Sequence, residues 1–409
     1  MNASSLVDQF EWLLSGEEGD VYSVYRRLRA ETPLLWSPAI TAWVVSRHVD
    51  VRRVLESDEF EPLTEGFGTP MIYGRTVLAM TGEEHRKKTA LIARRIRNLR
   101  RLEEQLQPLI REWCRGMVAE LPDSPEAFDL KSSYFTPLPL RVIAHLMGVE
   151  GAEKFREWYA AIVAGGMSNM RGDQAVKERA VAARESLFDF LRPRLEQMTL
   201  TPEDDLLSDL TTMEYEGARM TIDEILAFSA FLLVAGIETT ERTMTNLATT
   251  LAGRPDLWIR LRDDRSLVQP AIAEALRLTP PIHALTRKVA RELELHETRI
   301  APGDRIVALI ASANLDEAVF PHPEEFDLDR FRDNPRRQFT PKSDLISFGA
   351  GEHHCTGSLL ALVEMTEAFD ALLDSYESIS LGSAEPPAAV GYILRSPREL
   401  SVFGSRGTR

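Results

Sequence analysis

One stretch decides how this chain folds: Phe348-Gly349-Ala350-Gly351-Glu352-His353-His354-Cys355-Thr356-Gly357. Cys355 is one of only two cysteines in 409 residues, and an amphipathic run from about 359 to 376 follows it. Glycines at 349 and 351 allow the backbone to turn sharply and to approach a flat ligand, because they carry no Cβ. A cysteine at the start of a helix meets unpaired N–H groups and the positive end of the helix dipole, and both favour the thiolate. Such a thiolate is suited to be the axial ligand of a haem iron.

This stretch has two other interpretations. In the first, Cys355 is a buried structural thiol and the glycines belong to an ordinary loop. In the second, His353, His354 and Cys355 bind zinc. Three adjacent residues seldom point at one tetrahedral centre, and no second ligand pair follows at zinc-finger spacing. The haem interpretation is therefore preferred.

The spacing Phe-Gly-x-Gly-x-His-x-Cys-x-Gly resembles the haem-binding signature of the cytochrome P450 family, the haem-thiolate monooxygenases, at each of its fixed positions. The resemblance extends over nearly the whole chain. It implies a mainly α fold with a minor β portion, in a single domain over residues 1–409. It also implies haem b (iron protoporphyrin IX) with Cys355 as the axial iron ligand. The expected haem contacts within the stretch are Phe348, Gly349, His353 and Gly357.

Composition is that of a globular protein, with 44% apolar and 27% charged residues. No apolar stretch reaches the ~18 residues that a membrane span needs. Residues 1–19 lack the basic and apolar regions of a signal peptide. Two cysteines cannot build a disulfide framework, which favours a reducing, cytoplasmic location. A net charge of −15 disfavours nucleic acid as a partner.

Hydrophobic periodicity predicts a mostly helical chain. A helix is expected at 21–30, a strand pair at 34–36 and 41–46, and a short helix at 50–55. Helical patterns then dominate to about residue 278. Strands return between 293 and 311 around a Pro302-Gly303 turn, and the last long helix follows Cys355. Neither an internal repeat nor a linker is evident.

A long helix should begin at Thr221, because Thr221 and Glu224 form a capping-box pattern. Helical character continues for roughly thirty residues, or ~45 Å. The helix is apolar on nearly all sides at first and then meets a polar break, Ala235-Gly236-Ile237-Glu238-Thr239-Thr240. In the simplest interpretation, Thr239 bonds back to a carbonyl one turn earlier, and Glu238 forms a surface ion pair with Arg242.

The Ala-Gly-x-Glu-Thr sequence of this break resembles the oxygen-activating motif of the P450 family. By that resemblance, Ala235 and Gly236 leave room for the cofactor and for O2. Thr239 would hold oxygen or water by its hydroxyl, and Glu238 would relay protons from solvent. The pair favours O2 with supplied electrons over peroxide.

Two further groups of residues match the family. Glu274 and Arg277 stand three apart on a helix, and the resemblance implies a buried ionic triad with Arg330 that shapes the loop presenting the thiolate. An exposed pair of this kind would contribute only a few tenths of a kcal/mol. By the same resemblance, the haem propionates are held by His85, Arg287 and His353. The family often has Arg four residues after this first His, but here Thr89 stands in that place.

A basic run between Arg86 and Arg101 contains eight cations and no acidic residue. It could be a solvated helix face or a docking patch. The resemblance favours docking of an acidic ferredoxin or flavodoxin, with Lys87, Arg95 and Arg97 as the contact residues.

The substrate pocket is expected to be mostly apolar, which suggests a lipophilic small molecule, such as a terpenoid, polyketide or cyclic peptide of secondary metabolism. The reaction would be a hydroxylation, or an epoxidation, demethylation or coupling. The alternative is a non-catalytic haem carrier or sensor, against which Glu238 and Thr239 argue. The expected pocket residues are Phe67, Met71, Ile72, Tyr73, Met167, Leu232, His283, Ala284 and Leu285.

Overall fold

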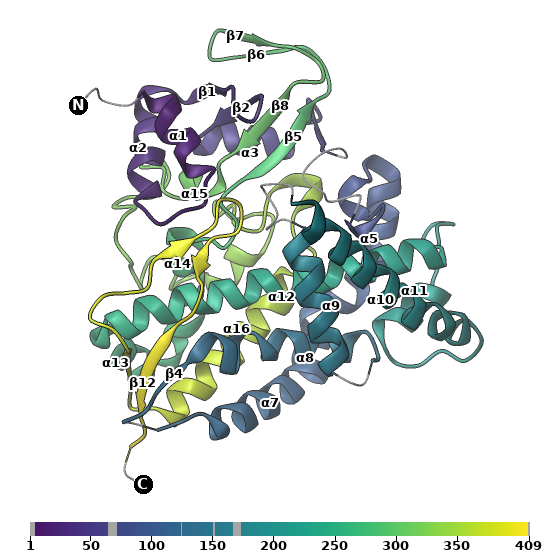
Figure 1. Ribbon diagram of the computed structural model, residues 1–409, viewed down its shortest axis with the longest axis vertical. Coiled ribbons are helices and arrows are strands. Elements are labelled where there is room, and N and C mark those ends of the chain that lie inside the picture. Colours follow the sequence, from purple (N-terminus) through teal and green to yellow (C-terminus); the bar gives the residue numbers. More distant parts are fainter. Residues whose placement is uncertain (1–4, 64–71, 124, 150–151, 167–172, 408–409) are drawn as a thin grey trace.

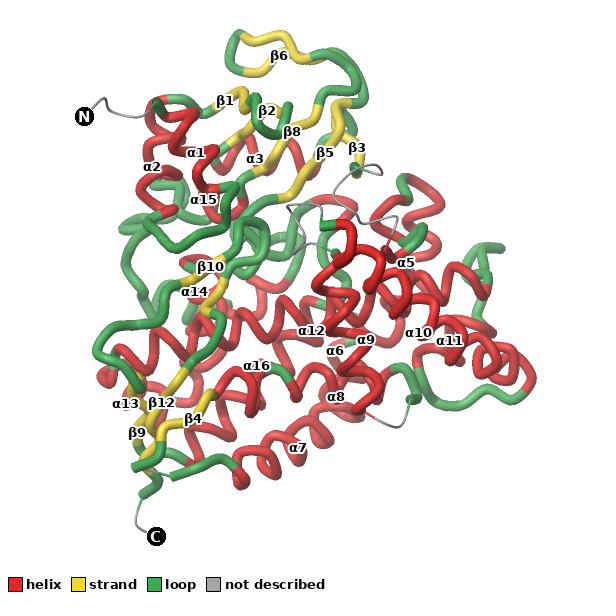
Figure 2. Tube along the Cα trace, in the orientation of Figure 1, coloured by secondary structure: helices red, strands yellow, loops and turns green. Residues whose placement is uncertain are grey.

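The computed structural model describes residues 5–63, 72–123, 125–149, 152–166 and 173–407, and is mainly α with a minor β portion. Helices make up the lower and right-hand parts of the molecule in Figure 2, and strands gather along its top and left. The helices are α1 (Leu6–Leu13), α2 (Val21–Glu31), α3 (His48–Glu56), α5 (Gly82–Ile96), α6 (Leu99–Arg101), α7 (Gln107–Glu120), α8 (Pro137–Leu146), α9 (Ala152–Gly165), α10 (Gln174–Leu200), α11 (Leu206–Thr212), α12 (Ile222–Gly253), α13 (Pro255–Asp263), α14 (Val268–Leu278), α15 (Ile310–Ala313) and α16 (Ser358–Ser375). Shorter 3-10 or π turns are η1 (Val77–Ala79), η2 (Leu102–Leu106), η3 (Lys131–Phe135), η4 (Arg265–Leu267), η5 (Pro335–Phe339) and η6 (Gly351–His353).

The largest sheet has five strands in the order β1-β2-β8-β5-β3. Its strands are β1 (Leu34–Ser37), β2 (Ala42–Val45), β3 (Phe60–Pro62), β5 (Leu285–Val289) and β8 (Arg305–Ala308). Among the described strands, only β2 and β8 pair in parallel, which joins the N-terminal part of the chain to a strand from its second half. The smaller sheets contain β4 (Ala127–Asp129), β9 (Ser378–Leu381) and β12 (Ser401–Ser405), then β6 (Leu293–Leu295) with β7 (Thr298–Ile300), and β10 (Ala389–Val390) with β11 (Ser396–Pro397).

Helix α12 crosses the centre of the molecule, and α8, α9, α10, α14 and α16 pack against it (Figure 1). It begins with the predicted capping box, in which Thr221 Oγ1 accepts from the Glu224 N–H at 3.2 Å and Glu224 accepts from the Thr221 N–H at 2.7 Å. From Ile225 to Val234 every residue except Phe231 is buried, as expected from the apolar sequence. The main hydrophobic core surrounds this helix.

Most helices lie where the sequence places them, but several elements differ. Strands β3, β4 and β5 were not predicted, and α15 begins where the region predicted as strand ends. Helix α1 was not expected, although Ser5 and Asp8 form a capping box at its start. Helix α3 begins two residues before the predicted position, at His48. Within the described ranges, no helix has the length and apolar character required to cross a bilayer.

Candidate functional site

The loop before Cys355 is fixed by its glycines and by one backbone hydrogen bond. Gly349 and Gly351 have φ of +73° and +67°, a region that L side chains rarely adopt. A Cβ at Gly351 would lie 2.8 Å from the Leu55 carbonyl oxygen, so α3 also requires glycine there. The Cys355 N–H donates to the Phe348 carbonyl at 2.8 Å and closes the loop.

Cys355 lies three residues before α16, where the backbone N–H groups of Gly357 and Ser358 lower the pKa of its thiol, as the sequence predicts. Desolvation by the protein atoms packed around the loop is the larger effect, however, and leaves that pKa above its ordinary value even though the residue keeps accessible surface. The side chain itself is exposed, while the neighbouring His354 and Ser358 are buried. The thiol therefore borders accessible space within a dense part of the protein. The amides alone do not make it a thiolate, but coordination to a metal deprotonates such a thiol.

Three basic side chains gather near this loop without a matching number of anions. The rings of His85, on α5, and His353 lie 4.2 Å apart between centroids. His353 Nε2 is buried and has no hydrogen-bond partner. Burial first, and then His85 and Arg287, lower the pKa of His353 to about 3. Burial also lowers the pKa of Arg287 to about 10, and within the described part of the chain its side chain donates only to the Thr286 carbonyl, at 3.1 Å. This unsatisfied basic cluster fits the carboxylates of a haem.

Thr89 has its own role in the basic cluster. Its hydroxyl lies 3.2 Å from His85 Nε2, one helical turn away. Glu352 lies 3.3 Å from His85 Nδ1. Burial lowers the pKa of His85, and Glu352 partly opposes that shift. Thr89 therefore orients the imidazole instead of supplying a second cation.

In the polar break of α12, Ala235, Gly236 and Thr239 are partly exposed in an otherwise buried helix. A Cβ at Gly236 would lie 2.5 Å from Ile143 Cδ1, so this glycine also permits close packing of α8. Phe231 is partly exposed too and stands in register with Ala235 and Thr239 at intervals of four. Phe231 was not predicted from the sequence, although helical periodicity could have identified it.

Both contacts of the simplest interpretation of this break are present. Thr239 Oγ1 donates to the Ala235 carbonyl at 3.0 Å. Glu238 pairs with Arg242 through Nε at 2.8 Å, but the pair is buried, not at the surface. Tyr159 on α9 donates to the other carboxylate oxygen at 2.6 Å. Glu238 is thus a buried carboxylate that is fully hydrogen-bonded.

Glu274, Arg277 and Arg330 meet in a buried ionic triad. Arg277 forms a two-pronged pair with Glu274, at 2.7 and 2.8 Å. Arg330 Nε donates to the same carboxylate at 3.1 Å. Arg277 also donates to the carbonyls of Pro323 and Glu325, at 2.7 and 2.9 Å. The triad therefore ties α14 to the irregular segment that leads to Cys355.

Comparison with known proteins decides the family. The family model described as "Cytochrome P450" matches residues 173–400. Nocardicin C N-oxygenase of Nocardia uniformis subsp. tsuyamanensis is 31% identical, over 94% of this chain and 95% of its own. Mycinamicin IV hydroxylase/epoxidase of Micromonospora griseorubida is 31% identical, over 88% and 89%. The substrate-free crystal structure of CYP109E1 from Bacillus megaterium has a TM-score of 0.83 and 26% identity, and it covers 94% of this chain and 99% of that one. The chain belongs to the cytochrome P450 family.

This P450 is a monooxygenase that binds haem b, as the family and its fold require. Cys355 is the only described cysteine that borders accessible space, since Cys114 is fully buried. The exposed thiol, the positive-φ glycines and the unsatisfied basic cluster together suit a flat, anionic cofactor. The residues present therefore fit the group.

The expected pocket residues fall into three groups. Phe67, Met71 and Met167 lie outside the described residues. Ile72, Tyr73, Leu232, His283 and Ala284 are almost fully buried, and Leu285 is half-buried. His283 is held by aromatic residues of α2, since Tyr25 Oη lies 3.1 Å from its Nδ1 and Tyr22 packs on its ring. Its side chain faces α2. Tyr73 contacts Phe231, with ring centroids 6.0 Å apart, and so lies next to the accessible face of α12.

Most of the basic run is neutralised, which its local sequence does not reveal. Lys87 pairs with Glu83 at 2.7 Å. Arg95 is buried between Asp204 and Asp209. Arg86, Lys88, Arg100 and Arg101 also have acidic partners. Among the described residues, Arg94 and Arg97 alone in this run have no ion pair. The charge of Arg97 lowers the pKa of both His354 and Cys355, which places this cation near the thiolate loop.

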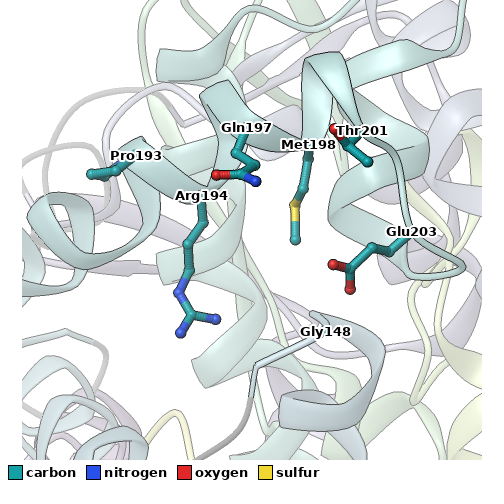
Figure 3. Close-up of a pocket in the computed structure, with 7 residues that line it drawn as sticks. All are labelled: Gly148, Pro193, Arg194, Gln197, Met198, Thr201 and Glu203. Atoms are coloured by element: carbon teal, nitrogen blue, oxygen red, sulfur yellow. The ribbon is translucent and has the colours of Figure 1, made fainter.

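A separate hollow of about 310 Å³ lies along the end of α10 (Figure 3). It shares no residue with the sites described above, and Arg194, Gln197 and Glu203 give it a polar lining. We assign it no part in the chemistry.

Proposed function

We propose that residues 1–409 act as one haem-thiolate domain that oxidises a lipophilic small molecule with O2 and with electrons from a cytoplasmic ferredoxin or flavodoxin. The observation that carries this proposal is the polar break in α12. There Thr239 borders accessible space, and the adjacent Glu238 is a buried, hydrogen-bonded carboxylate. A haem carrier or sensor has no need for such a pair.

The roles of the side chains follow from their positions. Cys355 would hold the iron, while His85, Arg287 and His353 would hold the propionates. When bound, the haem supplies the reductive activation of O2 and the oxidation of the substrate. Thr239 would donate and accept hydrogen bonds at the O2 side, and Glu238 would supply protons to it.

Faster haem loss from Arg287→Met than from wild type would support the propionate assignment, and equal retention would contradict it.

The substrate is proposed to be an apolar product of secondary metabolism. Phe231, Ala235 and Tyr73 give the accessible face of α12 an apolar and aromatic character. Two relatives are named for the oxidation of nocardicin C and mycinamicin IV. The reaction would be a hydroxylation, or an epoxidation, demethylation or coupling. A ligand screen by spin-state shift tests this assignment, since polar metabolites that bind better than apolar ones would contradict it.

Glu238→Gln and Thr239→Ala should each lower the oxidised product formed per NADH, with losses in the rate of product formation of roughly a hundredfold or more. The measurement is product against NADH with a surrogate ferredoxin system. Thr239→Ser, which keeps the hydroxyl, should retain most of the coupling. Thr249→Ala is a matched control, because Thr249 also bonds back to a carbonyl on α12, that of Thr245, at 2.8 Å. NADH consumption by wild type without product from any ligand would instead favour the carrier or sensor.

The electron donor is proposed to dock at the unpaired cations Arg94 and Arg97. Arg94 is exposed, so Arg94→Glu should slow reduction by an acidic ferredoxin about tenfold at low salt, and less at high salt. Arg299→Glu is the control, because Arg299 is exposed on β7 and pairs with Glu292. Equal effects of the two variants, or a reduction rate independent of salt, would contradict docking at this place.

A further inference from the structure

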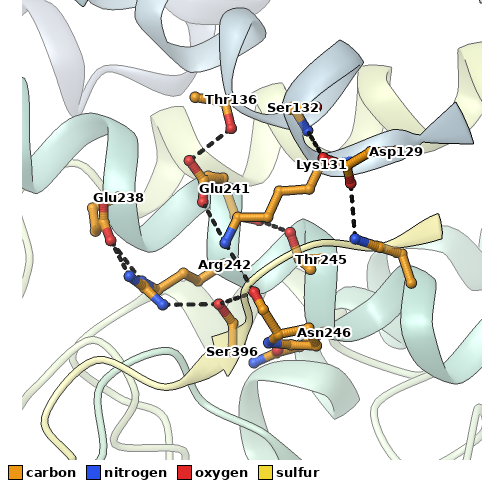
Figure 4. Close-up of polar contacts among 12 residues, drawn as sticks. Asp129, Lys131, Ser132, Thr136, Glu238, Glu241, Arg242, Thr245, Asn246 and Ser396 are labelled. Carbon is orange, nitrogen blue, oxygen red and sulfur yellow. Dashed lines mark hydrogen bonds and ion pairs between the residues drawn. The ribbon is translucent and has the colours of Figure 1, made fainter. Parts of the chain in front are cut away.

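A second buried carboxylate stands one helical turn after Glu238 on α12. Glu238 and Glu241 are each only 4% exposed. They lie in one polar network with Lys131, Arg242 and Ser396 (Figure 4). The family comparison assigns no role to Glu241, and the sequence analysis did not single it out.

The two carboxylates have partners of the same kind. Arg242 holds one oxygen of Glu238, and the Tyr159 hydroxyl holds the other. For Glu241, Lys131 Nζ lies 3.1 Å from Oε1, and the Thr136 hydroxyl donates to Oε2 at 2.9 Å. Each carboxylate therefore has one cation and one neutral donor. The four charges balance, which is the condition under which buried ions are tolerated.

The two ion pairs are joined through strand β11. Lys131 Nζ donates to the Pro397 carbonyl at 2.9 Å, and so does Ser396 Oγ at 3.2 Å. Arg242 Nη1 donates to Ser396 Oγ at 2.9 Å. Asp129 on β4 accepts from the Lys131 N–H at 3.2 Å and fixes the backbone of that lysine. A change of charge in the Lys131–Glu241 pair can therefore affect the Arg242–Glu238 pair through these hydrogen bonds as well as through electrostatics.

The groups around Glu241 set its proton affinity. Burial raises its pKa most, Lys131 lowers it, and the charge of Glu238 raises it again. The charge of Glu238 also acts on Tyr159 and Tyr73, but burial raises the pKa of each, so both hydroxyls stay neutral. Of the two, Tyr159 donates to Glu238. Arg395, directly before β11, donates to the carbonyls of Glu17, Gly19 and Gly391 and not to either carboxylate. Interacting carboxylates titrate as a pair.

We propose that Glu241 is a second proton-holding residue of the oxygen-activating site, coupled to Glu238 and tuned by Lys131. This inference rests on the proposed function, in which Glu238 supplies protons beside Thr239. Glu238 is connected to solvent through the partly exposed Arg242. Lys131 and Thr136 are also partly exposed and adjoin the exposed Ser132 and Ser133, so Glu241 has its own connection to solvent. A proton taken up there is stored one turn from Glu238.

The test compares Lys131→Met, Glu241→Gln and the double variant as holoenzymes. Removing Lys131 strands an anion, so the pair should take up its proton about one pH unit or more higher than in wild type. Glu241→Gln removes the anion and should shift the profile downward. In the double variant, Glu238 and Arg242 still balance, and most of both shifts should cancel. The readouts are the pH profile of product per NADH and an infrared titration of protonated carboxyl groups in the resting protein.

Arg111→Met is the matched control, because Arg111 pairs with the buried Glu367 at 2.8 Å and this ion pair is not part of the network. It should not move the profile. If Lys131→Met does not fold, Thr136→Val removes only the hydroxyl and should shift the profile upward by less. Single variants that move the profile no more than the control, or in the same direction, would overturn the proposal. The proposal would also be overturned if the signal of a protonated carboxyl group in Lys131→Met persisted in the double variant, which lacks the Glu241 carboxylate.

The infrared titration separates this inference from the proposed function. It reports Glu241 in the resting protein, whether or not Glu238 delivers protons. If Glu238→Gln leaves coupling unchanged while Lys131→Met still shifts the carboxyl signal, the proposed role of Glu238 fails and the paired titration stands. If Glu238→Gln uncouples turnover but Lys131→Met does not shift the carboxyl signal, the proposal for Glu241 fails and the proposed role of Glu238 stands.

Discussion

Cys355→Ser is expected to abolish the thiolate signature of the reduced, CO-bound absorption spectrum and to reduce monooxygenase turnover to background. The serine Oγ would lie at the same place, three residues before α16. A hydroxyl is far less acidic than a thiol, so the two amides that act on Cys355 would not ionise it. The electron donation by which a thiolate favours O–O cleavage would be lost. The absorption spectrum and product formation measure both effects.

Cys114→Ser is the matched control, because it makes the same substitution at the other cysteine. Cys114 is fully buried in α7, and burial raises the pKa of its thiol to about 12, which makes it inert. This variant should lose some stability and keep the spectrum. An unchanged spectrum in Cys355→Ser, or a lost one in Cys114→Ser alone, would overturn the assignment of the iron ligand.

Features that depend only on residues close together in the sequence were predicted from sequence patterns. The glycines before Cys355, the capping box at Thr221 and the apolar first half of α12 all act within one or two helical turns, and the structure contains each of them. The same reasoning should have found α1 from its capping box and Phe231 from its register with Thr239. These two omissions were avoidable.

Long-range partners could not be predicted in this way. Nothing near Arg95 in the sequence indicates that Asp204 and Asp209 neutralise it. Nothing near Glu238 points to Tyr159, and nothing near Glu241 points to Lys131. The parallel pairing of β2 with β8 is of the same kind. Each depends on how helices and strands from distant parts of the chain pack, so the docking surface and the polar network emerge only from the fold.

Arg277→Met is expected to lower the free energy of unfolding by about 3–5 kcal/mol, because it leaves the Glu274 carboxylate buried without its main cation. Both side chains are fully buried in the wild type. Urea unfolding followed by circular dichroism measures the loss, and haem retention should fall with it, since the triad holds the segment that leads to Cys355. Arg260→Met is the matched control. Arg260 forms an exposed pair with Asp329, and its loss should cost at most about 1 kcal/mol.

The double variant Glu274→Gln/Arg277→Met distinguishes the stranded charge from the other contacts of Arg277. Neutralising Glu274 removes the unpaired anion, so part of the lost stability should return. Recovery should stay incomplete, because the carbonyls of Pro323 and Glu325 still lack the donor that Arg277 provides. Full recovery would mean that Arg277 serves only to neutralise Glu274. A loss below about 1 kcal/mol in Arg277→Met would show that the triad does not stabilise the fold, since exposed pairs contribute that much.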